Sequence, residues 1–345
     1  MPTRRLFVLA FLCAALPGFG AETERVRLTL DASEAEAVLA ILGKGSGGQA
    51  VADADWRRLF DSEPYIRLKK REAAMRRNFT DDEFKTFVLS DDVAKQASAL
   101  QRTLEAWKKA DLRATAQRIL AYLPEDAQVR AKVYPMIKPK PNSFVFEVAT
   151  DPAIFLYLDP EQSQSEFENT VAHESHHIGY SGADKRYDDR IKGLPDNARK
   201  AAHWMGAFGE GLAVLAAAGS ADVHPMHDFK GDERVRWDQD MKYFDQELAQ
   251  VDQFFRDVLS GGFAKPEVAD HVAFTFYGYR GPWYVVGYKI GAVVEKRFGR
   301  GVLVDCMSDP RKLLAKYNEA AAEQNAAGQP RLPLWSAEVL KAVGH

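Results

Sequence analysis

The sequence has very little cysteine. Cys13 and Cys306 are the two cysteines in 345 residues. Cys13 lies in an N-terminal apolar run that we expect to be removed, so the mature chain would retain Cys306 alone. One cysteine excludes an intrachain disulfide and a cysteine-based zinc site, even in an oxidising compartment. We therefore expect a fold that relies on its core, with Cys306 as a buried apolar side chain.

The sequence also lacks a basic excess and a long apolar run. The formal net charge is −3, which argues against a nucleic-acid partner. The run Leu6–Leu16 is too short for an ordinary membrane span. It follows Arg4 and Arg5 and precedes small residues up to Ala21, the pattern of a secretory signal peptide. We predict a signal peptide at 1–21 and a periplasmic or secreted protein with no integral membrane span.

Internal repeats and low-complexity segments are absent too, and the remaining pattern is that of a mainly helical α+β protein. Most of the chain has helical spacing of apolar residues. Three short runs instead favour strands, at 26–30, 144–148 and 154–158. We expect the basic run Arg67–Arg71 to be a solvated helix face.

A change of composition divides the chain. Residues 22–137 are expected to be a mostly helical N-terminal region. The proline-containing segment Lys138–Asn142 is typical of a linker. Residues 138–345 would then form a second domain, which begins with two of the predicted strands and contains the motifs described next.

The segment His173-Glu174-Ser175-His176-His177 matches the H-E-x-x-H pattern. On a helix, His173 and His177 are four residues apart and project from one face, which suits two ligands of a tetrahedral metal. Glu174 can take a proton from a water at the open position of the ion. His176 fills a variable position. The alternative is a polar surface helix with solvated histidines.

The residues around the motif indicate that its helix is half-buried. Phe167, Val171 and Ile178 follow helical spacing. We expect the helix to end at Gly179 and the following Ser181-Gly182 pair.

A catalytic zinc needs a third protein ligand, with the fourth position left to water. Position 183 is alanine, which excludes a third histidine at the short spacing found in some peptidases. Glu210 is the next candidate, because it is the one carboxylate in the apolar segment Ala207–Leu215. Burying it without a partner would be costly, and a metal would supply the partner. The alternative is an exposed Glu210, or one paired with an arginine.

Three glycines and several further histidines lie near Glu210 in the sequence. Gly206, Gly209 and Gly211 would let its helix approach the motif helix closely. His203 lies seven residues before Glu210, on the same helix face, where it would either contact the ligands or pack. His224 and His227 are candidate ligands that rank well below Glu210.

Tyrosines at 284 and 288 are candidates for stabilising an oxyanion. They are four residues apart, so they share a helix face, and Gly287 and Gly291 would allow close packing there. We favour Tyr284, then Tyr288, with Arg280 as a further contact. The alternative is that these aromatic side chains belong to the core.

Taken together, these pieces resemble the zincin clan of metallopeptidases, in its H-E-x-x-H…E (gluzincin) branch. They most resemble a bacterial group named as zinc-dependent peptidases. The matching segments are 173–177, 209–213 and 283–288, and the resemblance covers about residues 140–300. It implies a zincin-like catalytic core with a small sheet beside the H-E-x-x-H helix. It also implies Zn²⁺ bound by His173, His177 and Glu210, with Glu174 as the base.

The leading hypothesis is a zinc-dependent peptidase that acts on peptides or proteins. A second hypothesis is a non-catalytic envelope binding protein that retains the fold, with a metal site closed by a fourth residue such as His203 or His224. A zinc hydrolase acting on another bond is a third, because the same water activation serves several bonds.

Overall fold

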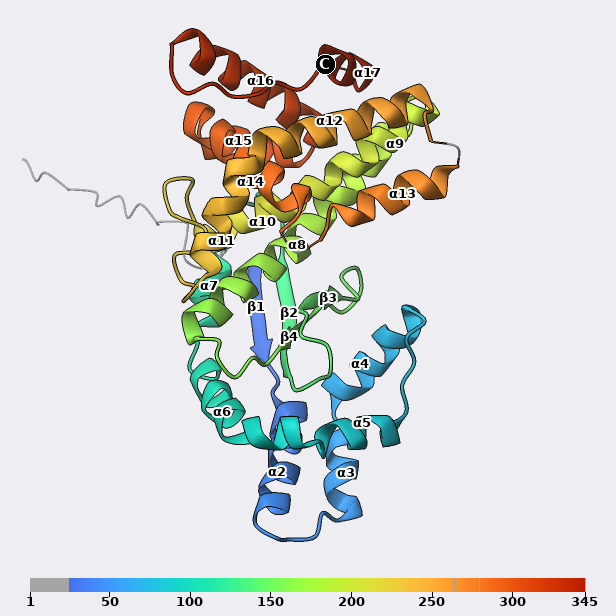
Figure 1. The fold of residues 1–345 in the computed structure, drawn as a ribbon, viewed down its shortest axis with the longest axis vertical. Helices are drawn as coiled ribbons and strands as arrows, with labels where there is room; N and C mark the ends of the chain where they lie inside the picture. The colour runs from blue at the N-terminus through green and yellow to red at the C-terminus, as the bar shows by residue number, and fades with distance from the viewer. Residues whose placement is uncertain (1–24, 264, 279, 345) are drawn as a thin grey trace, which may run out of the picture.

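The computed structural model describes residues 25–263, 265–278 and 280–344. The predicted signal peptide at 1–21 lies outside these ranges. The described chain is mainly helical around one four-stranded sheet, as expected (Figure 1). Within these ranges, no helix combines the length and apolar character that crossing a membrane requires.

The sheet has the strand order β1-β2-β4-β3. Strands β1 (Val26–Leu30), β2 (Val129–Met136) and β4 (Ala153–Tyr157) are parallel, and β3 (Phe144–Phe146) runs antiparallel to β4 at the edge. The three predicted strands are confirmed. The central strand β2 was not predicted, because the second half of its sequence is buried on both faces and does not alternate.

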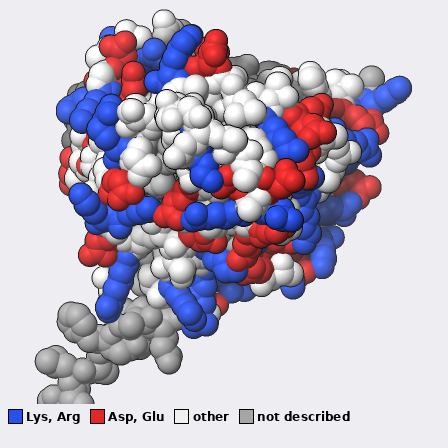
Figure 2. All heavy atoms as spheres, turned by 90° about the horizontal axis from the view of Figure 1, so that it is seen from below, with Lys and Arg blue, Asp and Glu red and all other residues white. Residues whose placement is uncertain are grey.

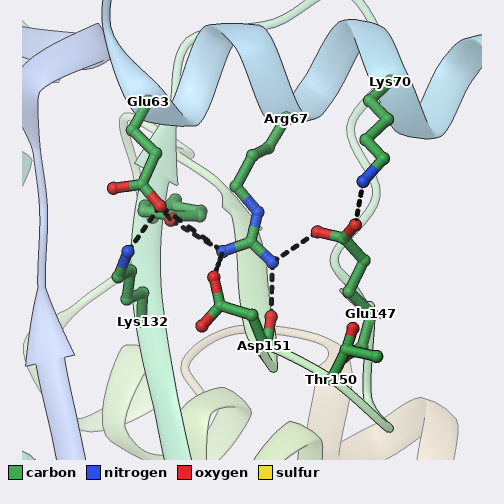
Figure 3. Close-up of polar contacts among 8 residues, drawn as sticks. Glu63, Arg67, Lys70, Lys132, Glu147, Thr150 and Asp151 are labelled. Carbon is green, nitrogen blue, oxygen red and sulfur yellow. Dashed lines mark hydrogen bonds and ion pairs between the residues drawn. The ribbon is translucent and has the colours of Figure 1, made fainter.

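Six helices lie between β1 and β2 in the sequence. They are α2 (Ser33–Ser46), α3 (Asp53–Phe60), α4 (Glu63–Ala74), α5 (Asp81–Val88), α6 (Asp91–Trp107) and α7 (Leu112–Leu120). In Figure 1, α2 to α6 occupy the lower half of the molecule. We predicted that the basic run on α4 is a solvated helix face. This prediction is wrong at Arg67, whose side chain is only 8% exposed, because acidic groups near the sheet surround it (Figure 3).

The sheet takes strands from both sides of the predicted boundary at residue 138. Residues 138–142 connect β2 to β3 within this one sheet, and Lys138 is buried there. Its ammonium donates hydrogen bonds to backbone and side-chain oxygens of Asn142, which fixes the connection. The division of the chain into two domains remains a prediction.

The H-E-x-x-H motif lies on α8 (Gln164–Ile191), which begins at a capping box formed by Ser163 and Glu166. The prediction that this helix ends at Gly179 is wrong. A Cβ atom at Gly179 would lie 2.3 Å from Leu123 Cδ1, so the glycine lets the α7–β2 connection pack directly on the helix. This packing outweighs the cost of about 1 kcal/mol that a glycine imposes within a helix.

The remaining elements are helical and fill the upper half of Figure 1. They are α9 (Asp196–Met205), the 3₁₀ helix η1 (Gly206–Phe208), α10 (Gly209–Ala218), α11 (Glu233–Asp240), the 3₁₀ helix η2 (Met241–Tyr243), α12 (Phe244–Ser260), α13 (Pro266–Thr275), α14 (Pro282–Phe298), α15 (Arg300–Met307), α16 (Pro310–Ala326) and α17 (Ala337–Ala342).

The helix α8 separates two apolar cores. Phe167, Val171 and Ile178 face the core of the sheet and the N-terminal helices. Ala172 and Tyr180 face the core of the C-terminal helices. Cys306 is buried in this second core, as predicted. The polar side chains of α8 between these two faces therefore lie where the two cores meet.

Charged side chains of both signs are distributed over the surface. Figure 2 views the molecule from the lower end of Figure 1, and lysine and arginine are intermingled there with aspartate and glutamate. This face offers no extended basic surface of the kind that binds nucleic acids.

Candidate metal centre

The helices α8 and α10 bring three potential metal ligands together. His173 Nε2 and His177 Nε2 are 3.1 Å apart. Each of these nitrogen atoms lies 3.3 Å from Oε2 of Glu210. The two histidines occupy successive turns of α8, and Glu210 is in the first turn of α10.

The spacing of these three atoms fits a tetrahedral metal. Ligand atoms about 2.0–2.1 Å from zinc, at the tetrahedral angle, are separated from one another by roughly 3.3–3.4 Å. The observed separations of 3.1 and 3.3 Å are close to these values. Two imidazoles and one carboxylate are also a ligand set that zinc commonly accepts. The residues present therefore fit zinc.

The three side chains are recessed but reachable. His173, His177 and Glu210 retain 17%, 22% and 19% exposure, respectively. Burial raises the pKa of Glu210, but the adjacent imidazoles of His177 and His173 lower that pKa more, and the net result is well below the usual range. Among the described residues no arginine pairs with Glu210, and its side chain is not exposed, so neither alternative for Glu210 holds.

Glu174 lies beside the two histidines on α8 and is half-buried. Burial raises the pKa of its carboxyl, the two histidines oppose this increase, and Glu210 adds to it. Glu174 is not one of the three clustered ligands. The motif thus supplies two potential metal ligands, His173 and His177, and next to them a carboxylate, Glu174, that is available for proton transfer.

Tyr284 on α14 is the second predicted catalytic residue near this centre. Its ring is stacked on His173, with centroids 6.3 Å apart and planes inclined by 13°. Burial and the negative charges of Glu210 and Glu174 raise the pKa of the phenol, so the hydroxyl keeps its proton. Tyr284 is thus a hydrogen-bond donor at the edge of the centre.

Tyr288 and Arg280 are not brought to this centre. The Tyr288 ring packs edge-on against Trp237 at 5.1 Å, and burial and the charges of Glu295 and Asp222 raise its pKa to about 12. Arg280 Nη1 donates to the backbone oxygen of Glu233 at 2.9 Å. The two tyrosines therefore have different neighbours although they share helical spacing: Tyr284 stacks on His173, and Tyr288 packs on Trp237.

The other candidate histidines bind acidic partners elsewhere. His203 Nδ1 lies 3.6 Å from Asp188, and His224 Nε2 lies 2.9 Å from Asp238. In the part of the chain that the structure describes, neither joins the cluster of His173, His177 and Glu210.

Tyr277 is a residue that the sequence did not single out. Its phenol adds to the raised pKa of Tyr284. The signal in the sequence was the aromatic-rich segment Phe276–Tyr288, but Tyr277 precedes α14, and helical spacing from Tyr284 does not predict its position.

Comparison with known proteins gives one match. No curated protein and no solved structure matches the chain. A family model described as "Putative zinc dependent peptidase (DUF5700)" matches residues 56–326. This range includes the motif helix, Glu210, Tyr284 and the whole sheet except β1. The chain therefore belongs to this zinc-dependent peptidase family.

Proposed function

We propose that this protein is a zinc-dependent peptidase in which His173, His177 and Glu210 hold the metal and Glu174 is the general base. The observation that carries the proposal is the triangle of ligand atoms, with sides of 3.1, 3.3 and 3.3 Å. The family description supports the zinc dependence and the peptidase class.

Zinc bound at these residues would supply a Lewis acid that polarises a substrate carbonyl and makes water more acidic. Glu174 accepts a proton from the attacking water and passes it to the leaving amine, so the carboxylate is restored after each turnover. Its position directly after His173 keeps it close to the reacting atoms without competing for the metal.

Tyr284 donates a hydrogen bond to the oxyanion that develops as the carbonyl is attacked. Its stacking on His173 and its raised pKa support this role, because the ring is held in place and the hydroxyl remains protonated.

The sheet edge suits a peptide substrate. Among the strands that the structure describes, β3 pairs with β4 alone, and β3 also contacts α8. An extended peptide can add to such an edge through backbone hydrogen bonds, which brings its carbonyl groups past the motif helix.

The location of His203 and His224 favours catalysis over a purely structural metal site. A closed site needs a fourth protein ligand, and both histidines are paired with aspartates elsewhere. We further propose that the protein is exported to the periplasm or secreted, on the evidence of the signal-peptide pattern at 1–21.

Zinc content tests the ligand assignment directly. Purified protein should contain about one zinc per chain, and Glu210→Ala should lose it or bind it much more weakly, because two imidazoles alone hold zinc poorly. Hydrolysis of a quenched fluorescent peptide library by the zinc-loaded protein tests the activity. Wild-type protein that takes up no zinc when zinc is supplied contradicts the proposal.

A further inference from the structure

Three aromatic side chains from α9, α13 and the start of the α13–α14 connection meet at the surface. Phe274 of α13 is 63% exposed, the highest value among the large apolar side chains of the described residues. Its ring meets that of Trp204 edge-on, with centroids 5.4 Å apart, and lies 6.3 Å from that of Tyr277. Trp204 and Tyr277 are half-buried. A single exposed apolar residue is ordinary, but rings in mutual contact form a patch, which we call the aromatic patch.

The first turn of α14 connects the aromatic patch to the candidate metal centre. Trp283 is fully buried, and its ring lies 6.5 Å from that of Trp204 and 6.4 Å from that of Tyr277. The next residue is Tyr284, whose ring stacks on His173. The Tyr277 phenol also adds to the raised pKa of Tyr284. Two consecutive residues of α14 thus contact the patch and a candidate metal ligand, respectively.

The backbone on both sides of Phe274 is anchored. Ala273 is fully buried, and its backbone oxygen accepts a hydrogen bond from Trp283 Nε1 at 2.9 Å. Phe276 is buried against the same tryptophan, with ring centroids 5.3 Å apart. Among the described helices and strands, none packs extensively on α13, which extends from the side of the molecule to the start of α14 (Figure 1). Phe274 is therefore held in place and accessible, so a ligand that covers its ring meets a small ordering cost.

Two acidic side chains share the exposed face of α13 with Phe274. Glu267 and Asp270 precede it by seven and four residues, spacings that place all three on one face of a helix. Both carboxylates are exposed, as Phe274 is. A negatively charged ligand group would be repelled at this face, whereas an uncharged apolar group would not. The chemistry of the patch therefore favours an aromatic or aliphatic group over an acidic one.

The size of the patch suits one side chain better than a protein surface. An aromatic side chain buries about 150–250 Å² when it is fully covered. Phe274 exposes 63% of its surface, and the other two rings are half-buried. The patch therefore offers on the order of 300 Å² of aromatic surface. A stable protein interface takes about 800 Å² from each partner, so the patch alone is too small for one.

We propose that the aromatic patch is a subsite for an aromatic or large aliphatic side chain of the peptide substrate, with Phe274 as the residue that determines this specificity. Edge-on and offset contacts between aromatic rings add to the free energy gained from burying their surface, so a phenylalanine of the substrate suits the patch well. The inference rests on the proposed peptidase function for the term substrate. The patch and its connection to Tyr284 are independent of that function.

Peptide binding tests the subsite without requiring cleavage. The zinc-loaded Glu174→Gln protein is titrated into three fluorescein-labelled, amidated octapeptides, and fluorescence anisotropy gives the Kd. The peptides share a background of glycine, alanine and glutamine and differ at one central position, which is phenylalanine, alanine or glutamate. We expect the phenylalanine peptide to bind ~10-fold more tightly than the alanine peptide. The glutamate peptide should bind no better than the alanine peptide.

Substitution of Phe274 assigns the preference to the patch. Phe274→Ser in the same background should remove most of the preference for phenylalanine and leave the affinity for the alanine peptide unchanged, whereas Phe274→Tyr should keep the preference. The matched control is Tyr243→Ser, which changes an aromatic side chain of η2 that is 55% exposed and lies outside the patch. Circular dichroism and thermal unfolding check that each variant is folded. With Glu174 restored, Phe274→Ser should lower kcat/KM for the phenylalanine peptide alone.

Equal affinities for the phenylalanine and alanine peptides would overturn the subsite. A preference that survives Phe274→Ser, or that Tyr243→Ser removes equally, would do the same. So would a wild-type dimer in size-exclusion chromatography that Phe274→Ser dissociates, because the patch would then be a contact between two copies. These outcomes are distinct from failure of the proposed function. A protein that binds phenylalanine peptides through Phe274 but hydrolyses none retains the subsite and loses the peptidase assignment, whereas an active peptidase without the preference loses only the subsite.

Discussion

Gly211 of α10 and Gly287 of α14 lie against each other where the two helices cross. A Cβ atom on Gly211 would be 2.0 Å from the backbone nitrogen of Tyr288, and one on Gly287 would be 2.6 Å from the backbone oxygen of Phe208. These neighbours are backbone atoms, which cannot move aside as a side chain can. The prediction that Gly211 contacts the motif helix is wrong, because this glycine lies against α14. Of Gly206, Gly209 and Gly211, only Gly209 lies against α8, where a Cβ atom would be 3.7 Å from Cε1 of Tyr180.

Gly211→Ala should therefore force α10 away from α14. We expect a loss of about 1–3 kcal/mol in the free energy of unfolding, the range seen when an overpacked site must rearrange. Zinc affinity should fall as well, since Glu210 precedes the glycine directly. Denaturant titration and zinc content are the two measurements. Gly206→Ala is the matched control, because a Cβ atom there meets no atom within 4 Å. Equal effects at both positions would contradict the tight helix crossing.

Glu174→Gln should separate metal binding from catalysis. The amide cannot accept the proton from water, so we expect kcat to fall by about 10²–10⁴-fold. Zinc content should remain that of the wild type, because Glu174 lies outside the cluster of ligand atoms. Hydrolysis of a fluorogenic peptide and metal analysis on the same samples provide the test. Unchanged turnover in this variant would exclude Glu174 as the base.

Tyr284→Phe should reduce kcat more than it changes KM. Removing one donor to an oxyanion costs roughly 10²–10³-fold in the best-studied cases, and the loss here should approach that range. The retained ring keeps the stacking on His173, so zinc content should be preserved. Tyr288→Phe is the control, since Tyr288 packs against Trp237. Equal kcat values for the two variants would rule out a specific role for Tyr284.

Stability should depend on pH through Glu34, which lies outside the candidate metal centre. Its side chain is fully buried, and Oε2 accepts a hydrogen bond from the Ile137 backbone at 3.0 Å. Burial raises the pKa of Glu34 to about 8. Between pH 4.5 and 8 the unfolded chain loses this proton while the folded protein keeps it. The free energy of unfolding should therefore decrease as pH rises through this window, by an amount on the order of a few kcal/mol.

Glu34→Gln isolates that contribution. The variant should match the wild type near pH 4.5 and become more stable than it by pH 8, because glutamine has no proton to lose. Urea titrations of both proteins at each pH cancel the effects of all other titrating groups. A difference in stability that stays constant across this range would show that Glu34 is ionised in the folded protein.

Local patterns in the sequence were sufficient for part of the site. The spacing of His173 and His177 is a property of a single helix, so the sequence alone predicts that both point the same way. The apolar surroundings of Glu210 made it conspicuous as a carboxylate in need of a partner. In both cases the relevant physical chemistry acts within about ten residues of the chain.

Neighbouring residues in the sequence do not predict which of the two tyrosines lies beside His173. Tyr284 and Tyr288 lie four residues apart with similar neighbours in sequence. Their surroundings differ in the fold, where Tyr284 stacks on His173 and Tyr288 packs on Trp237. The sheet depends likewise on the pairing of β1 with β2, strands that are about a hundred residues apart in sequence.

The sequence by itself determined the mainly helical α+β class, the two histidines with the carboxylate of Glu174 next to them, and Glu210 as the carboxylate most suited to join them. These follow from helical periodicity and from the cost of burying an unpaired charge. Only the tertiary structure decided that α8 continues through Gly179, that β2 is an inner strand of the sheet, and that Tyr284 rather than Tyr288 lies beside His173. Each depends on contacts between distant segments, whose packing energy outweighs local propensity.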